Sequence, residues 1–87
     1  MGGSMKKVLY EKALAESERS LPDAMRSMPE GVRKAHVKEI VDNAWRKVLH
    51  FHNQGVTDIA LLAKSFTIAY ISQATAEEMV RDIITAA

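Results

Sequence analysis

The stretch EGVRKAHVKEIVDNAWRKVLHFH, at residues 30–52, decides the fold. At 100° per residue, its apolar side chains fall in one arc, with Trp45 at the edge. The arc holds Val37, Ile40, Val41, Ala44, Val48 and Phe51. The opposite side is charged and holds two i,i+4 pairs of opposite sign, Lys38–Asp42 and Asp42–Arg46. The pattern predicts a long amphipathic helix, which we expect to end at Gly55 in a Schellman turn.

Two helix-start signals precede this helix. Ser20 is followed by Pro22, and Ser27 is followed by Pro29 and then by Glu30, as in a capping box. We therefore expect residues 21–28 to form at most a short helical turn that connects two helices. Residues 5–20 are rich in Lys, Glu, Leu and Ala, which favour a first helix.

The last helix is predicted to begin at Thr75, because Glu78 stands three residues later and completes a capping box. Its apolar stripe contains Met79, Val80, Ile83 and Ile84. The sequence thus predicts an all-α fold, a small bundle of four main helices with one short connecting turn. Residues 1–4 resemble a leader added for expression, and residues 5–87 are expected to form a single helical domain.

Between the long helix and the last helix, a segment is expected to start with a cap at Thr57 and to run through Ile71. Its apolar residues lie all around the helix axis. So short a chain can hardly cover such a helix, so we expect a second copy to bury it in a homodimer. The residues predicted to form this interface are Leu62, Phe66, Ile68, Tyr70 and Ile71. A competing interpretation makes residues 66–71 a short strand, because they are β-branched and aromatic.

Composition narrows the functional classes. The chain has 87 residues, a formal net charge of +1 and no cysteine, which excludes disulfides, thiol catalysis and cysteine-bound metals. The absence of cysteine fits a reducing compartment, and no secretory signal follows Met5, so a cytoplasmic protein is expected. The apolar run at residues 59–76 is diluted by polar residues, which favours a buried helix over a membrane span.

No pattern of catalytic residues emerges. On a helix, His50 and His52 point about 200° apart, and His36 lies several turns away, so no metal site is expected. The sequence contains no nucleophile elbow and no phosphate-binding glycine loop. We expect neither an enzyme nor a bound cofactor.

Residues 55–66 resemble the first helix of a helix-turn-helix, and residues 71–75 resemble the start of its recognition helix. In that interpretation Ser72, Gln73 and Thr75 face the DNA bases. The turn between the two parts is about three residues longer than usual, and residues 56–87 carry two positive and four negative charges. Phosphate contacts could come only from the N-terminal half, for example from Arg26, Arg33 and Lys34.

The sequence therefore predicts a small non-enzymatic regulatory or adaptor protein that acts through protein–protein contacts and self-associates. The surplus of apolar residues carries this prediction, since exposed apolar surface is typical of interfaces. The alternative is a small helix-turn-helix-like DNA-binding regulator.

Overall fold

The computed structural model describes residues 7–86 and confirms a small all-α bundle. In chain order the elements are α1 (Lys7–Arg19), α2 (Asp23–Arg26), α3 (Glu30–Asn53), α4 (Ile59–Ala63), the 3-10 helix η1 (Lys64–Ala69) and α5 (Gln73–Ala86). Four main helical segments result, because α4 runs directly into η1, and α2 is the short connecting turn. The described range contains no strand, so the strand interpretation of residues 66–71 is wrong. The expected leader at residues 1–4 lies outside the described range.

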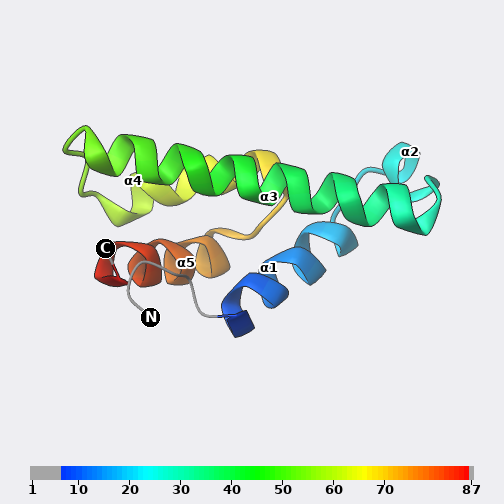
Figure 1. Ribbon diagram of the computed structural model, residues 1–87, viewed down its shortest axis with the longest axis horizontal. Coiled ribbons are helices and arrows are strands. Elements are labelled where there is room, and N and C mark those ends of the chain that lie inside the picture. The colour runs from blue at the N-terminus through cyan, green and yellow to red at the C-terminus, as the bar shows by residue number, and fades with distance from the viewer. Residues whose placement is uncertain (1–6, 87) are drawn as a thin grey trace.

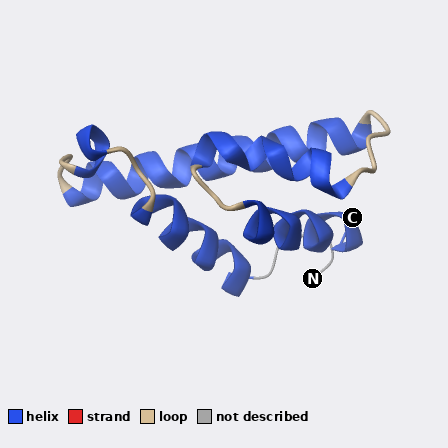
Figure 2. Ribbon diagram, turned by 180° about the vertical axis from the view of Figure 1, so that it is seen from behind, coloured by secondary structure: helices blue, strands red, loops and turns tan. Residues whose placement is uncertain are grey.

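Helix α3 runs the full length of the molecule (Figure 1). Its 24 residues span about 36 Å at 1.5 Å per residue, close to the longest dimension of 39 Å. The segment α4–η1 returns along α3 in the opposite direction. Helix α1 lies beside the N-terminal half of α3 and α5 beside its C-terminal half, as Figure 2 shows from behind.

The core forms where α3, η1 and α5 meet. Val37, Val41, Ala44 and Val48 are buried, as the apolar arc predicted. The arc ends before Phe51, whose side chain is 43% exposed. The remaining core side chains come mainly from the last two helical segments: Leu62, Ala63, Phe66, Ala69, Ile71, Ala76, Met79, Val80 and Ile83.

The apolar segment at residues 59–71 differs from its prediction. It forms one turn of α-helix and then a 3-10 helix, which ends where Tyr70 adopts a left-handed conformation with φ 60°. Helices α3 and α5 cover its inner side, so Leu62 and Phe66 are buried without a second copy. Leu61 and Ile68 remain about half exposed on the outer side. A single chain therefore covers the inner side of the segment but not its outer side, and burial of the outer side by a second copy stays a prediction.

Helix α3 ends as predicted. The Val56 amide donates to the Phe51 carbonyl at 3.0 Å, and the Gly55 amide donates to the His52 carbonyl at 3.0 Å. Gly55 has φ +98°, a conformation that glycine adopts without a steric penalty. These bonds form the Schellman turn and satisfy carbonyls that the helix end leaves free.

The helix starts differ from the predicted caps. Asp58 rather than Thr57 caps α4, accepting from the Leu61 amide at 3.2 Å. Before α3, the Ser27 hydroxyl donates to the Ala24 carbonyl instead of capping, and Pro29 occupies the cap position with its fixed φ. Pro22 likewise occupies the cap position of α2, without a side-chain cap.

Helix α5 begins one turn earlier than predicted. Ser72 accepts a hydrogen bond from the Thr75 amide at 3.3 Å, so Ser72 is the cap and Thr75 lies inside the first turn. The left-handed Tyr70 ends η1 two residues before Ser72, which lets the helix start there. Thr75 is consequently buried and free to form a tertiary contact.

We expect Phe66→Ala to lower the free energy of unfolding by about 3–5 kcal/mol, because it leaves a cavity in the core. Urea denaturation monitored by circular dichroism measures the change. Ile68→Ala is the matched control on the exposed side of η1 and should change stability by no more than about 0.5 kcal/mol. A mild effect at Phe66 combined with a severe effect at Ile68 would mean that η1 faces the other way.

Candidate protein-binding groove

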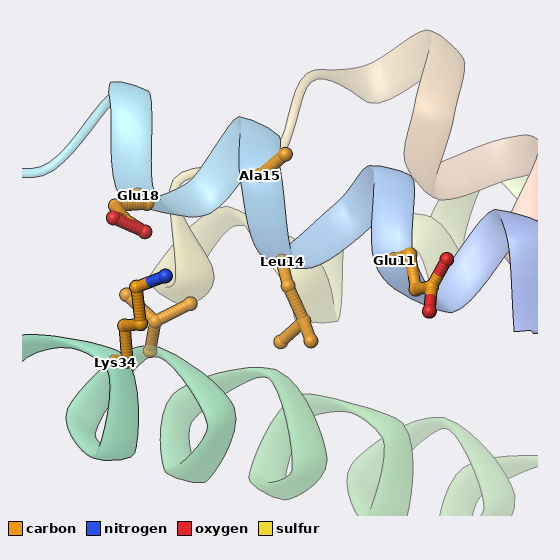
Figure 3. A pocket seen from close by; sticks show the side chains of 6 residues that line it. Glu11, Leu14, Ala15, Glu18 and Lys34 are labelled. Carbon is orange, nitrogen blue, oxygen red and sulfur yellow. The ribbon is translucent and has the colours of Figure 1, made fainter. Parts of the chain in front are cut away.

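A hollow lies between α1 and the N-terminal half of α3. Its volume is about 280 Å³, and its lining is mainly apolar, with Leu14 and Ala15 from α1 and Val37 from α3 among the lining residues. Figure 3 shows Leu14 pointing toward α3.

Three charged residues complete the lining of this hollow. Glu11 and Glu18 come from α1, and Lys34 comes from α3. In Figure 3 the side chains of Glu18 and Lys34 point toward one another from opposite walls. The hollow is thus apolar inside and charged at its edge, which is typical of a protein-binding groove.

A second hollow, of about 530 Å³, continues the first toward α2. The two share Ala15 and Glu18, so we treat them as one groove. The other lining residues of the second hollow are Arg19, Arg26 and Arg33. We call this part the basic end of the groove.

The chain fixes Arg33 firmly at the basic end. Its Nε donates to Glu18 Oε2 at 3.4 Å, and its Nη1 donates to the carbonyls of Met28 at 3.1 Å and Arg26 at 3.4 Å. These bonds tie α1 and the residues around α2 to the start of α3. Arg33 therefore shapes the groove and neutralises Glu18.

The other cations of the groove are less engaged. Arg26 pairs with Asp23 at 3.6 Å in an exposed i,i+3 contact, which contributes only about 0–1 kcal/mol. Arg19 and Lys34 are exposed and form no hydrogen bond or ion pair within residues 7–86. Up to three cations at or beside the basic end are thus available to an anionic group.

Helix α1, one wall of the groove, is held by two carboxylates. Glu16 accepts from the Ser72 amide at 2.5 Å and from the Thr75 hydroxyl at 2.8 Å, both at the start of α5. Asp42 of α3 accepts from the Tyr10 hydroxyl at 2.7 Å, and the Tyr10 ring also packs against Trp45 with centroids 5.9 Å apart.

These hydrogen bonds shift the pKa of each carboxyl. Burial alone would raise the pKa of Glu16, but the bonds from Ser72 and Thr75 outweigh burial and lower it. Burial likewise acts to raise the pKa of Asp42, and the hydrogen bonds from Lys38 and Tyr10 reverse the effect and lower it. For Tyr10, burial and the bond to Asp42 both raise the pKa. Both carboxyls are therefore held in the charged form.

The residues predicted to form a dimer interface do not share one surface. Leu62, Phe66 and Ile71 lie in the core of the single chain. Ile68 is 51% exposed, and Tyr70 is half-buried. Contact of the three buried residues with a second copy would require opening of the core.

The residues predicted to contact DNA are engaged within the chain. Thr75 is buried and bonded to Glu16. Gln73 is exposed, but its Nε2 donates to the Ala60 carbonyl at 3.1 Å and to Glu77 at 2.9 Å. Ser72 is exposed, but its amide faces the Glu16 carboxylate. A carboxylate at the start of α5 would repel a phosphate backbone placed there.

Within the described residues, no group of three or more His, Asp or Glu side chains could hold a metal ion. His50 is exposed and packs edge-on against Phe51, with ring centroids 5.4 Å apart. None of the described helices is long and apolar enough to cross a membrane.

The groove was not predicted, because no interface was assigned to residues 5–20. Two signals were present in the sequence. Ala15 is a small residue beside the larger Leu14 in the middle of a helix, and Arg19, Arg26, Arg33 and Lys34 concentrate positive charge within 16 residues. Their meeting on one side of the molecule depends on the packing of α1 against α3.

Comparison with protein-family models, with curated proteins and with solved structures finds no match to this chain.

The hydrogen bonds at Asp42 predict a loss of stability in acid. A carboxyl with a lowered folded-state pKa stabilises the fold above its unfolded pKa of about 3.9, and this stabilisation disappears as the pH falls through the folded pKa. We expect the free energy of unfolding to decline below about pH 4 and to decline less steeply in Asp42→Asn. Urea denaturation between about pH 2 and 7 tests this, with Asp23→Asn as an exposed control. Equal acid dependence in wild type and Asp42→Asn would contradict the role of Asp42.

Proposed function

We propose that this protein is a non-enzymatic adaptor or regulatory module that binds a partner protein in the groove between α1 and α3. The observation that carries the proposal is the continuity of an apolar hollow with a basic end, both lined by Ala15 and Glu18. Apolar contact supplies affinity, while charge selects the partner and its orientation.

The chemistry of the groove favours an acidic amphipathic helix as the partner segment. Its apolar side chains would enter between Leu14 and Val37, in a space large enough for one or two side chains. Its carboxylates would meet Arg19 and Lys34, which form no ion pair within the described residues. Carboxylates are preferred partners of guanidinium groups, which bind them through paired hydrogen bonds.

Charge balance along the groove supports an acidic partner. Four lining residues are basic and two are acidic. The Glu18 carboxylate is paired with Arg33, which leaves Glu11 as the one acidic lining residue outside an ion pair. A basic segment would therefore face an excess of like charge.

Self-association has weaker support than the groove. Of the five residues proposed for a dimer interface, only Ile68 is largely exposed. We therefore treat a dimer as a separate outcome, to be measured by light scattering before the binding experiment.

We expect a helical peptide of about 16 residues, with a leucine stripe flanked by glutamates, to bind at least about tenfold more tightly than the same stripe flanked by lysines. The expected difference arises because the basic end attracts carboxylates and repels ammonium groups. Fluorescence anisotropy at low and physiological salt gives the affinities, and amide shifts in NMR spectra locate the site on α1 and α3.

The double variant Arg19→Glu/Lys34→Glu should lose the preference for the acidic peptide. Lys47→Glu/Lys64→Glu carries the same charge change on exposed residues outside the groove lining and should bind as wild type does. Equal affinity for both peptides, or shifts confined to α4 and η1, would refute the groove. Tighter binding of a DNA duplex, lost in the same double variant, would favour the DNA-binding alternative instead.

A further inference from the structure

Helix α1 has a weak apolar anchor. Its only fully buried side chains are Ala13 and Ser17, which are both small. The Ser17 hydroxyl is buried without a hydrogen-bond partner among the described residues, which is unfavourable. Leu9, Tyr10 and Leu14 pack against the core but remain partly exposed. The position of α1 therefore depends strongly on its polar contacts.

The contact of Glu16 with α5 is the most specific of these. The first turn of α5 contains no acidic residue of its own, although the amides of a helix start attract negative charge. Glu16, which lies 56 residues before Ser72 in the chain, supplies that charge. Its carboxylate accepts hydrogen bonds from the Ser72 amide and from the buried Thr75 hydroxyl. A residue of α1 thus completes the cap of α5.

We infer that Glu16 is a positioning residue for the groove: by capping α5, it fixes the rotation and depth of α1. Leu14, Ala15 and Glu18 lie within two residues of Glu16 and form part of the α1 wall of the groove. If the cap is lost, α1 moves and that wall moves with it. The importance of the wall for partner binding rests on the proposed function.

The surroundings of Glu16 contain few other charges. Arg19, one turn later on α1, acts on the Glu16 carboxyl through its charge, and Ser72 and Thr75 face it from α5 as uncharged donors. Lys12 pairs with Glu78 at 3.4 Å as a second, exposed contact between α1 and α5. Acidification that protonates Glu16 should therefore release α1 from the start of α5.

The position of α1 can be measured without a partner. The chain has no cysteine, so Val8→Cys and Ala35→Cys accept spin labels selectively on exposed sites of α1 and α3 that lie outside the groove lining. We expect a narrow distance distribution in this background and a broadened or shifted one when Glu16→Ala is added. Glu11→Ala removes an exposed glutamate of the same helix and should leave the distribution unchanged.

Conservative variants separate positioning from general destabilisation. Glu16→Gln keeps an oxygen that can accept from the Ser72 amide, so we expect it to restore part of the narrow distribution and to reduce its response to pH. In the protein that keeps Glu16, the distribution should broaden only below the ordinary glutamate pKa of about 4.3, because the bonds from Ser72 and Thr75 lower the pKa of Glu16. If Glu16→Ala fails to fold, Thr75→Val tests the same cap, because it removes only the hydroxyl donor and should cause a smaller shift in the same direction.

The inference would be overturned if Glu16→Ala gave the same distance distribution as the control Glu11→Ala. If Glu16→Ala does not fold, an unchanged distance distribution in folded Thr75→Val would overturn it. Titration with the acidic peptide then separates this inference from the proposed function. Movement of α1 together with a severalfold weaker affinity supports both. Movement of α1 in a protein that binds no peptide supports the positioning role of Glu16 and refutes the proposed function.

Discussion

The burial of Phe66 against the apolar face of α3 is the contact on which the remaining structure depends. Phe66 is the largest fully buried side chain, and it lies among Val41, Ala44 and Val48 in the one core of the described chain. The 3-10 turns of η1 and the left-handed Tyr70 return the chain from this contact to the start of α5. Helix α5 packs against α4 and η1, so the placement of its apolar surface depends on this contact.

Helix α1 is attached by a different kind of interaction. The core joins α3, η1 and α5 through large apolar side chains, whereas α1 contributes small ones and is oriented by carboxylates. Hydrogen bonds to charged groups are directional and sensitive to pH, while apolar burial is neither. Helix α1, which has the weakest apolar anchor, also forms one wall of the groove. The wall that a partner would contact is therefore the one whose position can adjust most easily.

The parts of the fold that could be predicted are those set by local pattern. The α3 arc and the Gly55 turn depend on residues close in sequence, so periodicity and glycine chemistry found them. The start of α5 could not be found this way, because Ser72 and Thr75 both carry a hydroxyl suited to capping. Only a residue 56 positions away, Glu16, shows why Thr75 belongs inside the helix. The groove was missed for the same reason, since it exists only where α1 meets α3.

The internal use of acidic side chains also changes the charge that a partner encounters. Composition gives a net charge of only +1, which by itself predicts no preference for an acidic or a basic partner. Of the three charged residues at the C-terminal end of α1, Glu16 is bonded to α5 and Glu18 to Arg33, whereas Arg19 forms no ion pair within the described residues. Folding thus withdraws negative charge from α1 and leaves Arg19 and Lys34 facing solvent. The same bonds that position α1 therefore make its groove more basic than the sequence as a whole.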